Sequence, residues 1–153
     1  MQNNIIKVIL NDALEIISFL DKELTKKERY FFPLTLKELI VLLTSKEDSA
    51  YVVIMNQEIV AYGHMRTFNK KYKIPALGIA VGKRYRGLGI ANNLCLYMLD
   101  IYKNRGYKQV MLKVNKENLK AQNLYKKLGF ITYQEDFITY QEDDEQKWMI
   151  KKL

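Results

Sequence analysis

The chain has 153 residues, of which 48% are apolar, and this length is typical of one globular domain. A single cysteine and a single histidine exclude an intramolecular disulfide and any cysteine-rich zinc site, and they argue against a histidine-based metal centre, so no metal is expected. Lysine and arginine number 25 against 17 acidic residues, and the formal charge of +8 favours an anionic partner: nucleic acid, a phosphorylated cofactor or an acidic substrate.

Membrane association is not expected, because the sequence contains no run of 18 apolar residues. The first ten residues, MQNNIIKVIL, lack the basic region and long apolar core of a secretory signal. We therefore expect a cytoplasmic protein.

The first third of the chain is predicted to form one strand and two helices. Residues 5–10 (IIKVIL) have the composition of a strand, and residues 11–24 carry apolar residues at helical spacing. Thr35, followed by Glu38 three residues later, is a capping-box signature for the second helix. The intervening basic and aromatic segment is predicted to be a loop or a bent helical segment.

The rest of the chain alternates strands with helices. The predicted elements are a hairpin at 50–68 with its turn at 56–58, a strand at 76–81, a helix at 90–106, a strand at 109–114, a helix at 118–129 and strands at 130–134 and 147–153. This order indicates an α/β fold in which one domain, 1–153, contains a partly parallel sheet flanked by antiparallel hairpins.

Residues 131–144 (ITYQEDFITYQEDD) contain the segment ITYQED twice. We interpret this repeat as a local duplication that lengthens the last hairpin and gives it an acidic tip. The lengthened hairpin is the place where a contact between two copies of a homodimer is expected.

The stretch VGKRYRGLGIANN (81–93) joins the predicted strand 76–81 to the following helix and combines three cations with two glycines at Gly87 and Gly89. Glycines allow backbone N–H groups to approach a ligand, and N–H groups at a helix start attract anions. The P-loop pattern is absent, and the third glycine of the dinucleotide-binding pattern is missing. The stretch therefore indicates a phosphate site of another type.

Two motifs in this region resemble the signatures of the GNAT superfamily of N-acetyltransferases. LGIAVGKRYRGLGIANNL matches the acetyl-CoA signature through Arg84, Gly87 and Gly89. VNKENLKAQNLYKKLGF resembles the second signature, and its matching residues are Asn118, Ala121, Tyr125, Gly129 and Phe130. The resemblance implies a GNAT-like fold with a mixed, mostly antiparallel twisted sheet of about seven strands and about four helices on its faces.

The resemblance also implies an acetyl-CoA site. The pyrophosphate would bind the glycine stretch, whose expected contacts are Arg84, Arg86, Gly87, Leu88, Gly89, Ile90 and Ala91. The pantetheine arm would run along the preceding strand at Ile79, Ala80 and Val81, and would be contacted by Asn118, which is also expected to cap the helix after it. Tyr125 matches the family tyrosine that protonates the departing thiolate, and a phenol is protonated at pH 7.

The reaction implied is direct attack of an amine on the thioester within a ternary complex, which requires a group that accepts the amine proton. Many relatives carry a glutamate on the strand before the glycine stretch, but ALGIAV contains no acid. His64 on the neighbouring strand is the candidate base, and Glu23, Glu28 or a water relay are alternatives. Cys95 lies in the apolar pattern of a helix, so an acyl-enzyme route is rejected.

The acceptor is expected to be a small-molecule amine. Tyr30, Phe31 and Phe32 could line its pocket and would suit a nucleotide-linked amino sugar, unless they only pack the helices. Two other functions stay open: an acyl-CoA-binding module without catalysis, and a nucleic-acid-binding protein. The sequence carries no nucleic-acid-binding motif, so no nucleic-acid partner is expected.

Overall fold

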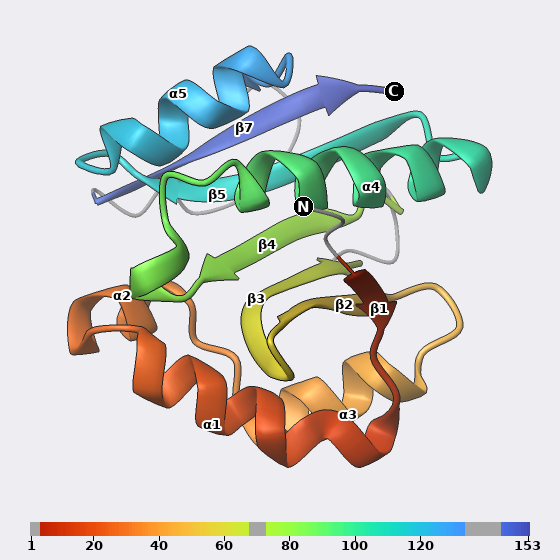
Figure 1. The fold of residues 1–153 in the computed structure, drawn as a ribbon. Coiled ribbons are helices and arrows are strands. Elements are labelled where there is room, and N and C mark those ends of the chain that lie inside the picture. Colours follow the sequence, from red (N-terminus) through yellow and green to blue (C-terminus); the bar gives the residue numbers. More distant parts are fainter. Residues whose placement is uncertain (1–3, 68–72, 134–144) are drawn as a thin grey trace.

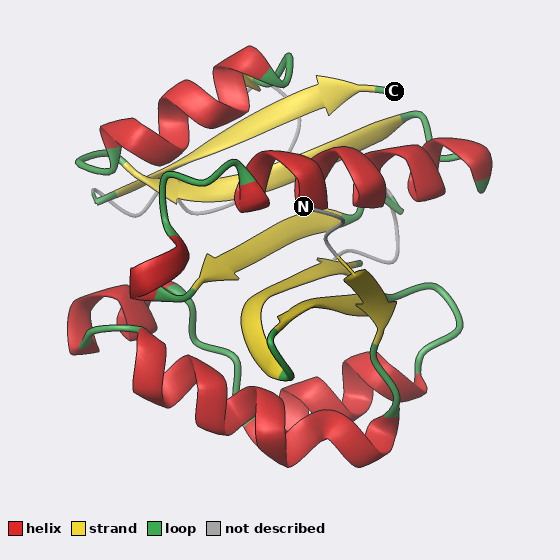
Figure 2. Cartoon of the chain, viewed as in Figure 1, coloured by secondary structure: helices red, strands yellow, loops and turns green. Residues whose placement is uncertain are grey.

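A twisted seven-stranded sheet with helices on both faces forms the framework of the computed structural model, which describes residues 4–67, 73–133 and 145–153 (Figures 1 and 2). The strands are β1 (Asn4–Lys7), β2 (Ser49–Met55), β3 (Glu58–Arg66), β4 (Ala76–Val81), β5 (Gln109–Asn115), β6 (Ile131–Thr132) and β7 (Gln146–Lys152). Their order in the sheet is β1-β2-β3-β4-β5-β7-β6, and every neighbouring pair is antiparallel except β4–β5. The predicted mixed, mostly antiparallel sheet is confirmed.

Five α-helices occur in the described residues, so the expectation of about four was one too low. They are α1 (Ala13–Glu23), α2 (Lys26–Phe31), α3 (Leu36–Thr44), α4 (Ile90–Asn104) and α5 (Leu119–Lys127). The additional helix is α2, in the segment predicted as a loop or bent helical segment. Thr25 starts it with a capping box to Glu28, and it ends just before Pro33, where the helical conformation is disfavoured.

The predicted capping box of α3 is confirmed. The Glu38 N–H donates to Thr35 Oγ1 over 3.2 Å, and the Thr35 N–H donates to Glu38 Oε2 over 2.9 Å. The first strand is shorter than predicted, because the Ile9 N–H donates to the Asp12 carboxylate and opens a 3₁₀ turn at Leu10–Asp12.

Two hydrophobic cores lie on opposite faces of the sheet. One is covered by α4 and α5 and includes Leu94, Met98 and Phe130. The other is covered by α1 and α3 and includes Ile16 and Leu39. Successive residues of a strand point to opposite faces, so the side chains of β2, β3 and β4 contribute to both cores.

The parallel strands β4 and β5 are in register only at their start, where Ala76 faces Met111. In Figure 1 the two strands separate from each other toward the end of β4. The repeat at 131–144 lies largely outside the described residues, so the lengthened hairpin stays a prediction. Within the described ranges, no helix is long and apolar enough to span a lipid bilayer.

Candidate active site

The edge of β4 that faces β5 has an unpaired backbone over most of its length in the described structure. Its other edge pairs with β3 from Ala76 to Val81, whereas only Ala76 pairs with β5, opposite Met111. Ile79 and Val81 are half-buried and contact the core under α4, and Ala80 is buried on the opposite face. An extended ligand can therefore pair with this edge as an added strand would.

The glycine stretch follows β4 directly and forms the start of α4. Gly87 and Gly89 both adopt left-handed backbone conformations, with φ of 80° and 79°. No side chain caps the amino end of α4, so the first N–H groups of this 15-residue helix are left for another partner. A β-carbon at either glycine would lie in open space, and the loop surface is therefore accessible to a ligand.

These features fit the pyrophosphate of acetyl-CoA, which needs several N–H donors and no obstructing side chains. Leu88 is exposed, Ile90 is buried in the core, and Ala91 lies half-buried in the first turn of α4. The left-handed conformations of Gly87 and Gly89 explain why glycine stands at both positions, and their contact with a pyrophosphate stays a prediction.

The cations of the stretch differ in their surroundings. The Arg84 side chain is 75% exposed and approaches Glu58 only to 4.0 Å, so it is accessible to a phosphate group. Arg86 instead turns back onto the protein. Its Nε donates to the Val81 carbonyl over 3.0 Å, and its Nη1 donates to Glu28 over 2.8 Å.

Tyr125 lies in α5, buried in the core beneath α4. Its ring packs edge-on against Phe130, with centroids 5.9 Å apart. Burial and the neighbouring Cys95 raise the pKa of Tyr125 above its ordinary value, so the hydroxyl is protonated at neutral pH and able to donate. Burial also raises the pKa of Cys95 to about 12, which suppresses its thiolate form.

Asn118 caps α5, as the sequence predicts. Its side-chain oxygen accepts a hydrogen bond from the Ala121 N–H over 3.1 Å. Asn118 is exposed, and its contact with a cofactor arm stays a prediction.

His64 lies on β3 and faces the core opposite α4. Its Nδ1 lies 3.2 Å from the Tyr62 hydroxyl, and its ring contacts that of Phe32 with centroids 5.4 Å apart. Burial lowers the pKa of His64 to about 3, and the positive charge of Arg66 adds to this effect. The imidazole is therefore neutral at pH 7, but it is a weak base, so its assignment as the catalytic base stays a prediction.

The two alternative carboxylates both bind the glycine stretch. Glu23 Oε2 accepts the Lys83 N–H over 2.8 Å. Partial burial alone would raise the pKa of Glu28, but hydrogen bonds from Thr25 and Arg86 outweigh burial and lower it. The sequence presents these two glutamates only as candidate bases. Their contacts with the loop join residues 60 and 58 positions apart, so no local spacing reveals them.

The predicted acceptor residues lie at the end of α2. Tyr30 and Phe31 belong to this helix, and their side chains lie outside the described part of the structure. Phe32 is half-buried and packs edge-on against Tyr62 with centroids 6.1 Å apart, besides its contact with His64. The position of Phe32 accords with the packing role that the sequence left open.

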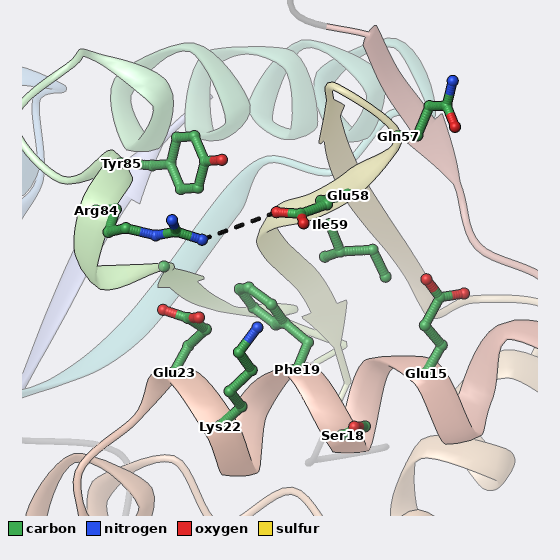
Figure 3. A pocket seen from close by; sticks show the side chains of 11 residues that line it. Glu15, Ser18, Phe19, Lys22, Glu23, Gln57, Glu58, Ile59, Arg84 and Tyr85 are labelled. Carbon is green, nitrogen blue, oxygen red and sulfur yellow. Dashed lines mark ion pairs between the residues drawn. The ribbon is translucent and has the colours of Figure 1, made fainter.

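A cavity of about 220 Å³ lies beside the glycine stretch, between α1, the turn joining β2 to β3, and the loop after β4 (Figure 3). Its lining mixes carboxylates with cations: Glu15, Glu23 and Glu58 face the same space as Lys22 and Arg84. No local pattern in the sequence indicates this cavity, because its walls come from three separate segments.

The family model described as the acetyltransferase (GNAT) family matches residues 13–130, which confirms the resemblance found in the sequence. Among curated proteins, N-alpha-acetyltransferase 30 of Schizosaccharomyces pombe is 41% identical over 56 residues. That match spans 37% of this chain and 37% of the relative.

Solved structures share the fold along nearly the whole chain. A GNAT-family acetyltransferase from Streptococcus pneumoniae is 24% identical, with 97% of this chain and 98% of that chain covered at a TM-score of 0.78. The ribosomal-protein-S18-alanine N-acetyltransferase from Escherichia coli is 19% identical, with 99% and 94% covered at a TM-score of 0.76. The expected fold class is thereby confirmed.

Proposed function

Because this chain belongs to the acetyltransferase (GNAT) family, whose members are acetyl-CoA-dependent N-acetyltransferases, we propose that it transfers an acetyl group from acetyl-CoA to a primary amine. The observation that carries the proposal is the continuity of two features. The unpaired edge of β4 leads directly into the glycine stretch, where the uncapped start of α4 offers N–H donors. An extended arm that ends in a pyrophosphate matches both features at once.

In this proposal each part of the site has one role. The backbone of Ile79–Val81 holds the pantetheine arm, and the N–H groups from Arg84 to Ala91 hold the pyrophosphate. Acetyl-CoA supplies an acyl group activated as a thioester. N–H groups of β4 that lack a strand partner would donate to the thioester carbonyl oxygen as negative charge develops on it.

Tyr125 is proposed to protonate the CoA thiolate as it leaves. The support is its position in the second signature, together with a hydroxyl that carries its proton at neutral pH. Cys95 takes no part, since its raised pKa and burial fit a packing role.

For the amine proton we favour a relay through water, one of the alternatives that the sequence leaves open. A base is most effective when its pKa lies near the working pH, whereas the pKa of His64 is about 3. Glu23 and Glu28 are already engaged by the glycine stretch. His64→Gln tests this assignment: kcat/KM should fall less than about tenfold, and a loss of about 10²-fold would restore His64 as the base.

The acceptor is proposed to be a small-molecule amine, as the aromatic end of α2 suggests, with a nucleotide-linked amino sugar as the first candidate. The amino terminus of a polypeptide is the second candidate. It is favoured by the identity of 41% over 56 residues with an N-alpha-acetyltransferase.

The experiment is a free-thiol release assay with acetyl-CoA and a panel of amines: nucleotide-linked amino sugars, polyamines, aminoglycosides and peptides with free amino termini. Thiol release that depends on one amine supports the proposal and identifies the acceptor class. Binding of acetyl-CoA without release by any amine would favour an acyl-CoA-binding module. Failure to bind acetyl-CoA, together with salt-dependent retention on nucleic acid, would favour a nucleic-acid-binding protein.

A further inference from the structure

We propose that Arg86 and Glu28 are positioning residues that join α2 to the glycine stretch, so that binding of CoA also stabilises α2. The inference rests on the proposed function, because it takes the glycine stretch as the site of the CoA pyrophosphate. It reassigns Arg86, which the sequence places among the phosphate contacts.

Arg86 is held on the protein by two hydrogen bonds. Its guanidinium bridges two elements, since Nε donates to the carbonyl of Val81 at the end of β4 and Nη1 donates to Glu28 on α2. A planar guanidinium can hold two such partners at fixed angles, whereas a lysine ammonium cannot. Gly87 is the next residue, so the orientation of Arg86 fixes the point where the left-handed turn begins.

Both carboxylate oxygens of Glu28 accept hydrogen bonds. Oε1 accepts from Arg86, and Oε2 accepts from the Thr25 N–H over 2.7 Å in the capping box of α2. One carboxylate therefore starts the helix and binds the glycine stretch. Movement of Arg86 would disturb the first turn of α2, and fraying of α2 would release Arg86.

A residue of α1 also holds the loop after β4, beside the junction that Arg86 and Glu28 form between α2 and the glycine stretch. Glu23, the last residue of α1, accepts the Lys83 N–H over 2.8 Å, and the Gly82 N–H donates to the Val60 carbonyl over 2.8 Å. Because Glu23 and Glu28 flank the short connection between α1 and α2, the loop after β4 is held at two points. The residues predicted to bind the acceptor, Tyr30–Phe32, lie just beyond the second point.

Coupling of this kind is reciprocal: if α2 stabilises the loop for CoA, then CoA stabilises α2 to the same extent. The alternative is that Arg86 leaves Glu28 and contacts the pyrophosphate directly. The two models make opposite predictions for Glu28. Loss of its charge weakens CoA binding if Glu28 positions the loop, but strengthens binding if Glu28 merely competes with phosphate for Arg86.

The test measures the affinity for CoA by calorimetry. Glu28→Gln retains a side-chain oxygen for the capping box but removes the charge that holds Arg86. We expect this variant, Arg86→Gln and Arg86→Lys each to bind CoA about fivefold more weakly. The double variant E28Q/R86Q should be no weaker than R86Q. Tighter binding by E28Q, or unchanged binding by R86K, would overturn the proposal.

Lys27→Gln is the matched control. Lys27 neighbours Glu28 on α2 and forms an exposed ion pair with Glu117 over 2.9 Å, with 67% and 79% of the two side chains exposed. Its loss removes one positive charge, as Arg86→Gln does, without touching the loop after β4. CoA affinity should stay within about twofold of the parent protein, because this pair does not contact the glycine stretch and is more exposed than the Arg86–Glu28 pair, whose side chains are 43% and 37% exposed.

Hydrogen exchange provides a readout that a merely structural role would not change. CoA should slow the exchange of amides 26–31 in the parent protein but not in E28Q. If the parent protein fails to bind CoA, the proposed function fails, and the junction is still testable without ligand. Glu28→Gln should then accelerate exchange of amides 83–89, and unchanged exchange there would overturn the inference.

Discussion

The imidazole of His64 lies directly against the backbone of Gly78, its partner on the neighbouring strand β4, and a β-carbon at residue 78 would overlap Nε2. The ring is held in this position by Tyr62 and Phe32. Glycine is therefore required at position 78, because the His64 ring occupies the space that a side chain would need.

Gly78→Ala should destabilise the protein by about 1–3 kcal/mol, because the buried imidazole must move or the strands must separate. Urea denaturation of the variant measures this loss. The double variant G78A/H64A should recover part of it, since removal of the ring makes room for the methyl group. If the stability loss of the double variant equals the sum of the losses of the two single variants, the overlap with His64 does not cause the instability of Gly78→Ala.

Stability should fall as the pH is lowered from 7 toward 5, owing to His64. Its pKa is lowered from 6.5 to about 3 in the folded state, by burial first and then by Arg66, with Glu38 opposing. Between these values the unfolded chain binds a proton that the folded chain does not, so the stabilisation present above pH 6.5 is lost as the pH falls. The expected slope approaches about 1.4 kcal/mol per pH unit.

Denaturation of the parent protein and of His64→Gln at pH 7 and pH 5 checks this prediction. The variant should lose less stability between the two pH values, because it lacks the titrating group. Glu28 and Glu38 also have lowered pKa values, but they affect stability only below about pH 4.5. Equal losses in both proteins would show that His64 does not cause the dependence.

Tyr125→Phe should lower kcat by about 10²-fold while the affinity for acetyl-CoA changes little, because the variant loses a proton donor but keeps the ring. The ring's contact with Phe130 is retained, so the melting temperature should stay close to that of the parent protein. Steady-state kinetics and calorimetry separate the two effects. Unchanged turnover would remove Tyr125 from the mechanism.

Gly89→Ala should weaken acetyl-CoA binding and also cost about 1 kcal/mol of stability, since alanine is strained at a φ of 79°. Gly106→Ala is a matched control. Gly106 has a φ of 90°, nothing within 4 Å of its added β-carbon, and a position after the other end of α4. Its stability loss should be similar, with affinity unchanged. Equal affinities of the two variants would argue against pyrophosphate at the start of α4.

Local patterns in the sequence determined most of the fold and identified the residues proposed for the donor side of the site. The capping box at Thr35, the helical spacing of α4 and the glycines at 87 and 89 each depend on residues close together in the chain. The two family signatures are local as well, so Tyr125 and Asn118 could be singled out before any contact was known. Local patterns were less informative at α2, where six residues are too few for a clear period, and at the end of β1, where a 3₁₀ turn replaces the predicted strand residues.

Only the tertiary structure decided which charged residues pair across distant segments. Arg86 and Glu28 are 58 positions apart, and Glu23 and Lys83 are 60 apart, so no local spacing could pair them. The low pKa of His64 likewise comes from burial beneath Phe32 and against Gly78, which the strand pattern alone cannot reveal. Backbone preferences are set by neighbours in sequence, whereas electrostatics and burial are set by neighbours in space.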